Sequence, residues 1–169
     1  MTDIKPILAS QYHAALKTLK QAIDRCPDNL WLQVGPQPAP YWQIVYHALF
    51  FTDLYLQISD SHFKAWAYHK HEFPGLDLLS QNDGKLPEGL EPYTIAQMHE
   101  YWQIVDDMVE PCLQQMDITS PESGFHWYKV SKLEHQIINI RHTQHHAAQL
   151  ADRLRVGANV GVDWVSAGG

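Results

Sequence analysis

Residues 141–150 have the sequence RHTQHHAAQL, which places three histidines within five residues of one helical segment. His142 and His146 are four residues apart, so their side chains leave the same face of a helix one turn from each other. A helix offers two ligands to one metal ion by this spacing. Two ligands make an incomplete site, so a third has to come from elsewhere in the chain.

The helix that carries this stretch is predicted to begin after Ser131 and to run to about Val156. Ser131 and Glu134 have the spacing of a capping box, in which each side chain caps the backbone of the other residue. Gly157 is expected to end the helix, because glycine readily adopts the left-handed conformation that follows a helix.

A third helix is predicted to follow the capping box formed by Thr94 and Gln97. Its apolar side chains recur every three or four residues as far as Leu113. Pro111 is expected to kink or interrupt this helix near its end, because proline lacks the backbone donor that a helix needs.

Two more helices are predicted near the N-terminus, over residues 6–25 and about 40–59, joined by a proline-rich connector over residues 31–40. Residues 60–93 contain repeated glycines and prolines and are predicted to form one long irregular crossover between the second and third helices. The expected fold is therefore an all-α four-helix bundle that forms a single domain over residues 1–169.

The predicted second helix supplies a candidate third ligand, His47. At about 100° per residue, His47 lies between Phe51, at about +40°, and Leu54, at about −20°, so it points inward with the apolar stripe. A single inward histidine is most often a core residue held by hydrogen bonds, and the position alone does not identify a ligand.

The histidine face of the last helix has two interpretations. It is polar and lies opposite an apolar stripe, which is typical of the solvated side of an amphipathic helix. However, a solvated face is normally rich in lysine and glutamate, whereas this one consists mainly of histidine, asparagine and glutamine. Such neutral groups can converge on a site without burying permanent charge.

Composition excludes several classes of function. The formal net charge of −7 gives no electrostatic reason to expect nucleic acid or an anionic membrane as a partner. Cys26 and Cys112 are far apart and match no cysteine motif for zinc, haem or a disulfide scaffold. The N-terminal residues lack the pattern of a signal peptide, and the most apolar run is too short to span a bilayer, so a cytoplasmic protein is expected.

Other catalytic motifs are missing from the sequence. A di-iron carboxylate bundle requires Glu-x-x-His on two helices, and no glutamate is followed by histidine three residues later. The chain also lacks H-E-x-x-H, G-x-S-x-G, a P-loop and a Rossmann glycine pattern.

The segment from Asn139 to Gly157 resembles the last helix of the DinB-like superfamily, four-helix proteins that include the bacillithiol and mycothiol transferases. Their pattern combines a histidine in the second helix with H-x-x-[HW]-H near the chain end. Carried onto this sequence, the resemblance implies that His47, His142 and His146 are the metal ligands. His145 matches the pattern without being a ligand, because it points about 100° away from His146.

The resemblance also implies a cofactor and a chemistry. The expected ion is a divalent transition metal, with zinc or nickel favoured by the family, although three imidazoles also suit iron or copper. Such an ion can lower the pKa of a bound water or thiol. The implied function is a metal-dependent thiol transferase or hydrolase that acts on a small electrophile, and the thiol would be of low molecular weight. The alternative is a non-catalytic member that binds a metal or a small ligand.

Several secondary expectations complete this prediction. Dimers are common in the family, so a homodimer is expected by analogy. His135 lies on the same helix face as His142 and is a candidate fourth group near the site. Each ligand needs a partner that fixes its tautomer, and Asn139, Gln144 and Gln149 are the candidates.

Overall fold

The structure is a computed structural model that describes residues 3–35 and 39–168 of the chain. The predicted connector lies partly outside the described residues, because residues 36–38 fall within it. The four long helices are α1 (Lys5–Asp24), α3 (Tyr41–Leu56), α4 (Ile95–Gln115) and α5 (Lys132–Ala158). Three short helices lie between them: α2 (Asp28–Trp31), η1 (Asp60–His62) and η2 (Ser80–Asn82).

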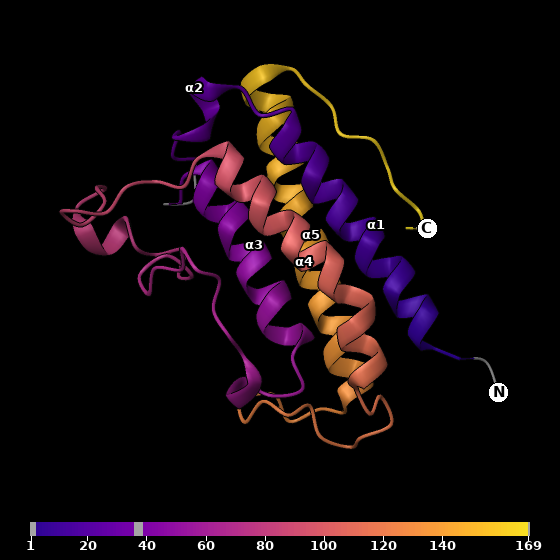
Figure 1. The fold of residues 1–169 in the computed structure, drawn as a ribbon. Coiled ribbons are helices and arrows are strands. Elements are labelled where there is room, and N and C mark those ends of the chain that lie inside the picture. The colour runs from indigo at the N-terminus through magenta and orange to yellow at the C-terminus, as the bar shows by residue number, and fades with distance from the viewer. Residues whose placement is uncertain (1–2, 36–38, 169) are drawn as a thin grey trace.

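The long helices form a bundle in which α1 packs against α4 and α5, and α3 packs against the same two helices. α1 and α3 therefore lie on one diagonal of the bundle, and α4 and α5 lie on the other (Figure 1). The described residues contain no strand, only an isolated bridge between Val34 and Pro40. The predicted all-α bundle, with a long loop between its second and third long helices, is confirmed.

The long loop projects on the side of α3 that faces away from α1 (Figure 1). It is nevertheless anchored to the bundle by aromatic side chains. The ring of Phe73 lies 4.8 Å from that of Trp42, and the ring of Tyr93 lies 4.7 Å from that of Tyr46. All four side chains are buried, and burial of each aromatic side chain stabilises the fold by about 1.5–3 kcal/mol.

The predicted helix starts agree with the observed caps. Thr94 accepts a hydrogen bond from the Gln97 amide, and the Gln97 side chain accepts one from the Thr94 amide, which completes a capping box. The Ser131 hydroxyl accepts from the Glu134 amide at 3.2 Å, which is one half of the second predicted box. These bonds satisfy backbone donors that a helix start leaves unpaired.

The helix interruptions differ from the prediction at two residues. Of the two outcomes predicted for Pro111, an interruption does not occur: α4 continues through it to Gln115, and the missing backbone donor does not end the helix. α5 passes through Gly157 and ends at Asn159, which adopts the left-handed conformation with φ 54°. Gly157 instead allows α2 to approach, since a Cβ there would lie 3.1 Å from a methyl group of Leu30.

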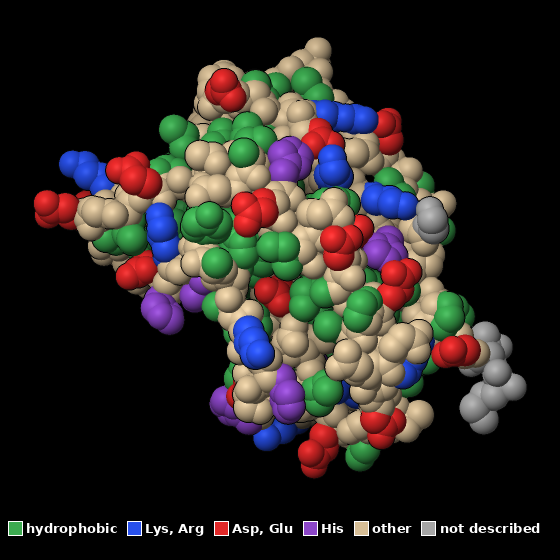
Figure 2. Space-filling view, in the orientation of Figure 1, with side chains coloured by type: hydrophobic (Ala, Val, Ile, Leu, Met, Phe, Trp, Pro, Cys, Tyr) green, Lys and Arg blue, Asp and Glu red, His purple; other side chains and the backbone are tan. Residues whose placement is uncertain are grey.

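None of the described helices is both long and apolar enough to cross a membrane. On the face shown in Figure 2, acidic and basic side chains are interspersed, and Lys and Arg do not gather into one continuous patch.

Candidate metal centre

Three histidines from two helices converge at the seam between α3 and α5. The Nε2 atom of His142 lies 3.1 Å from Nε2 of His47 and 3.1 Å from Nε2 of His146. One ligand atom from each histidine can be chosen so that all three lie within 4.8 Å of one another. The chain thus brings together the three residues that the sequence predicted as ligands.

Backbone and side-chain acceptors orient two of these rings. His47 Nδ1 lies 2.6 Å from the Pro74 carbonyl oxygen, and His146 Nδ1 lies 2.9 Å from the Gln149 side-chain oxygen. Since both oxygens only accept hydrogen bonds, each Nδ1 carries the proton and each Nε2 presents a lone pair. This is the tautomer that a histidine needs to bind a metal through Nε2.

The Pro74 carbonyl is itself held in place by Gln43, one turn before His47 on α3. The Gln43 amide donates to the carbonyl of Gly75 at 2.5 Å and to that of Phe73 at 3.4 Å, on either side of Pro74. Gln43 is fully buried. Sequence reasoning missed both Pro74 and Gln43, because no sequence pattern indicates which loop carbonyl will meet His47.

His142 differs from the other two histidines because its Nδ1 atom is buried and has no hydrogen-bond partner among the described residues. The sequence named Asn139 as a candidate partner, but its amide donates to the Thr52 carbonyl, and within the same residues its side-chain oxygen also has no partner. Gln149 is therefore the one predicted partner that the structure places on a ligand histidine. Over residues 3–35 and 39–168, no hydrogen bond joins Gln144 to the cluster.

Burial keeps the cluster neutral. Burial lowers the pKa of His47 to about 4, and burial together with the neighbouring histidines lowers the pKa of His142 to about 3. The pKa of His146 is also lowered, mainly by burial. All three rings are thus neutral near pH 7, and neutral imidazole is the form that binds metals.

The donor set fits a transition metal. In a tetrahedral zinc site with Zn–N bonds near 2.05 Å, ligand nitrogens lie about 3.3 Å apart, close to the two observed separations. The Nε2 lone pairs of His47 and His146 both point toward Nε2 of His142. This arrangement is repulsive unless a proton or a cation lies between the nitrogens. The cluster can therefore hold a metal ion through three imidazole nitrogens.

The histidine face of α5 is buried and not solvated, which overturns one of the two interpretations drawn from the sequence. His135, Asn139 and Thr143 are fully buried, and His146 is 6% exposed. The polar face can point into the bundle because its side chains form hydrogen bonds to α3. The Thr143 hydroxyl is hydrogen-bonded to the Thr52 hydroxyl, and the Asn139 amide donates to the Thr52 carbonyl. The cluster itself lies at the seam between the two helices, where His146 is buried and His47 and His142 are half-buried.

Three other predictions about histidines have different outcomes. His145 is exposed and belongs to no metal-holding group, in agreement with its predicted direction. His47 was expected in the centre of an apolar stripe, but it is half-buried because it faces α5 and not the middle of the core. His135, the candidate fourth group, does not belong to the cluster and lies among the rings of Tyr55, Phe125 and Tyr128.

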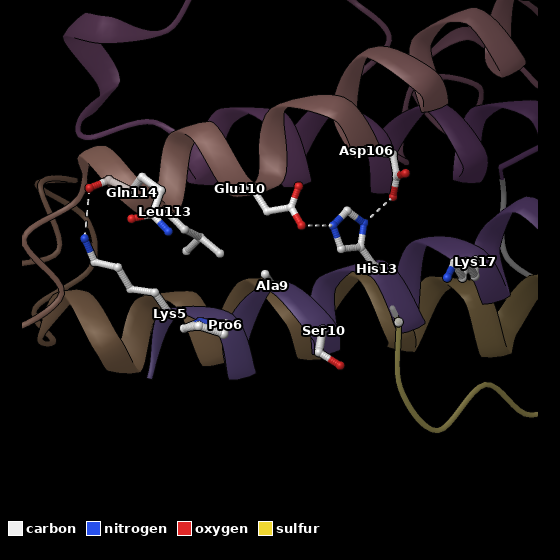
Figure 3. Close-up of a pocket in the computed structure, with 11 residues that line it drawn as sticks. Lys5, Pro6, Ala9, Ser10, His13, Lys17, Asp106, Glu110, Leu113 and Gln114 are labelled. Carbon is white, nitrogen blue, oxygen red and sulfur yellow. Dashed lines mark hydrogen bonds and ion pairs between the residues drawn. The ribbon is translucent and has the colours of Figure 1, made fainter. Parts of the chain in front are cut away.

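A separate polar hollow lies between α1 and α4 (Figure 3) and has a volume of about 470 Å³. At its wall, His13 lies between two carboxylates of α4, at 2.7 Å from Asp106 and 3.6 Å from Glu110. Lys5 reaches across the hollow to the Gln114 carbonyl at the end of α4. These contacts join α1 to α4, so His13 and Lys5 have a structural role in the hollow.

Comparisons with family models, with curated proteins and with solved structures each returned no match to this chain. The likeness to the DinB-like superfamily therefore rests on the residues of α3 and α5 quoted above.

Proposed function

We propose that this protein is a metal-dependent enzyme, a thiol transferase or hydrolase that acts on a small electrophilic substrate. The observation that carries the proposal is the convergence of His47, His142 and His146, in which the Nε2 atom of His142 lies 3.1 Å from that of each of the other two. The order of the helices and the motif in α5 resemble those of DinB-like transferases, which supports the same reaction class.

The residues of this chain supply binding and orientation. Three protein ligands leave a coordination position open, which is typical of catalytic and not of structural sites. The Pro74 carbonyl and the Gln149 side chain hold two imidazoles in the metal-binding tautomer. A zinc or nickel ion bound there would lower the pKa of a coordinated water or thiol, so that a nucleophile exists at neutral pH.

An aromatic side chain next to the histidines favours an apolar substrate body. The ring of Phe51 lies 4.7 Å from that of His47 and 5.6 Å from that of His142. Pro74 belongs to the long loop, which therefore contributes to the surroundings of the site. The proposed partners are a small electrophile and a low-molecular-weight thiol; a homodimer remains an expectation from the family.

One observation favours the alternative, a non-catalytic protein that binds a metal or a small ligand. Among the described residues, the hydrogen-bond and ring partners of the three histidines outside the cluster are Phe51, the Pro74 carbonyl, the Gln149 amide and His145. Only His145 among these can take up and release a proton, and its side chain lies in an exposed position. General acid–base catalysis by the protein would depend on that residue.

Metal content is the first test. The purified full chain, dialysed after exposure to zinc or nickel, should retain about one ion per chain by elemental analysis. His146→Ala should lose this ion, whereas His145→Ala, the matched control on the same helix, should retain it. Equal metal content in the two variants would refute the site.

Catalysis is tested separately with the metal-loaded protein. A panel of low-molecular-weight thiols is combined with electrophilic acceptors, and the rate is compared with that of the free ion at the same concentration. Turnover above the free ion that is lost in His146→Ala supports the enzyme. Stoichiometric metal without turnover supports the non-catalytic alternative.

A further inference from the structure

A second hollow, unrelated to the histidine cluster, lies between the second half of α3, residues 62–67 of the long loop and α4. Its volume is about 570 Å³, and Asp53 of α3 contributes to its lining. Asp53 follows His47 by six residues, so its side chain points about 120° around α3 and lies about 9 Å along the helix axis. The hollow therefore opens on a different side of α3 from the histidines.

Asp53 is a buried carboxylate without a counter-ion. It is 4% exposed and accepts hydrogen bonds from the Tyr101 hydroxyl at 2.9 Å and the Gln57 amide at 3.3 Å, both of them neutral donors. Within residues 3–35 and 39–168, no Lys, Arg or His nitrogen forms an ion pair with it. Burial raises the pKa of Asp53 to about 6, because the charged form lacks compensation.

The wall of the hollow combines polar groups with apolar side chains and one aromatic side chain, Trp66. The ring of Trp66 stacks on that of Tyr101 with a centroid distance of 4.6 Å and an interplanar angle of 3°. The Trp66 indole N–H donates to the exposed Glu100 carboxylate at 3.4 Å, which adds a second negative charge beside the opening. Ile104, 43% exposed, and Met108 extend the apolar wall along α4.

We propose that this hollow binds a small organic ammonium ion with an apolar or aromatic body. The ammonium group would pair with Asp53, and the body would lie against Trp66 and Ile104. A cationic ligand supplies the counter-ion that the buried carboxylate lacks, and an aromatic face attracts cations. The proposal does not depend on the metal site, so each can fail without the other.

Lys64 also lines the hollow, and its ammonium group would compete with a bound amine for the Asp53 carboxylate. Its side chain is exposed and makes no ion pair with Asp53 or Glu100. A positive charge at this opening should weaken the binding of an ammonium ligand by repulsion.

Isothermal titration of the full chain with 2-phenylethylamine tests the proposal at pH 8 and low salt, where Asp53 is ionised. The neutral analogue 2-phenylethanol should bind more weakly. Asp53→Asn keeps an oxygen acceptor for Tyr101 and should weaken amine binding by about 10-fold or more while leaving the alcohol unaffected. Asp106→Asn removes the same charge in the hollow between α1 and α4 and should change neither affinity.

Equal affinity for the amine and the alcohol would overturn the proposal, as would an unchanged amine affinity in Asp53→Asn. Equal weakening by Asp106→Asn would also overturn it, because it would reveal a general effect of net charge. If Asp53→Asn fails to fold, Lys64→Glu provides the second variant. It should tighten amine binding several-fold at low salt, and an unchanged affinity would count against the proposal.

Discussion

Two ends of the same buried face of α5 carry histidines in opposite situations. At one end, His142 and His146 meet His47, and acceptors orient two of the three rings. Two turns earlier, His135 is fully buried, and in the part of the chain that the structure describes neither of its ring nitrogens has a hydrogen-bond partner. Its neighbours are the rings of Tyr55, Phe125 and Tyr128, with centroids at 4.8–4.9 Å.

This difference shows that burial of a histidine does not by itself make it a metal ligand. Both ends share one helix and one face, and burial lowers the histidine pKa at both. Only the cluster combines converging lone pairs with partners that hold the tautomer, and this combination, more than a lowered pKa, makes a ligand site. His135 instead carries the cost of two unsatisfied polar atoms.

The largest expected effect is on metal affinity when a member of the cluster is removed. His142→Ala should weaken binding of zinc or nickel by several hundred-fold or more, because a structural zinc ion contributes about 10–16 kcal/mol shared among its ligands. Competition with a chromophoric chelator measures this loss. His135→Ala should leave the affinity unchanged; an equal loss would mean that the two ends of α5 are one site.

The next effect concerns acid stability at the other end. The pKa of His135 is lowered by burial, and to a smaller extent by Lys132, to about 4, so between pH 6.5 and 4 the unfolded chain takes up a proton that the folded chain does not. The free energy of unfolding should therefore fall with decreasing pH over this range, by up to about 3 kcal/mol from this residue.

Urea unfolding of metal-free protein at several pH values isolates that contribution. The other lowered histidines titrate in wild type and in His135→Phe alike, so the difference between the two curves reports on His135. If the free energy of unfolding depended on pH in the same way in both proteins, His135 would not be a neutral buried histidine.

A smaller effect is expected from the partner of His146. Gln149→Ala removes the acceptor that orients this ring and should weaken metal binding by about 10–100-fold. Gln144→Ala is the matched control, because Gln144 lies on the same helix and, among the described residues, forms no hydrogen bond to the cluster. Competition with the chromophoric chelator measures the metal affinity of both variants. Equal affinities would show that Gln149 does not contribute to metal binding.

The smallest effect is a gain in stability. His135→Phe places a ring of similar size among Tyr55, Phe125 and Tyr128 and removes two buried polar atoms that lack partners. The free energy of unfolding at pH 7 should rise by about 1–2 kcal/mol. A clear loss of stability in urea unfolding would indicate that His135 makes a stabilising contact, such as one to a buried water.

Much of the fold and of the cluster could be predicted from local signals. Helical periodicity, Pro6 in the first turn of α1, and the Thr94 and Ser131 caps act over three or four residues, so they placed the long helices without knowledge of the rest. The predicted end of α5 is two residues early. Gly157 lies inside the helix, where its missing side chain leaves room for Leu30, and Asn159 adopts the left-handed conformation that ends the helix.

The sequence by itself determined that His142 and His146 share one helix face, since the pitch of a helix makes this a local property. It also supplied His47 as the third histidine, through its position in the second long helix and the likeness to a family. Only the tertiary structure decided that this polar face is buried against α3, because the hydrogen bonds that compensate its burial come from Thr52 and other groups on distant segments. The same reason applies to the Pro74 carbonyl on His47 and to the unpaired charge of Asp53: each depends on which backbone and side-chain groups the folded chain brings together.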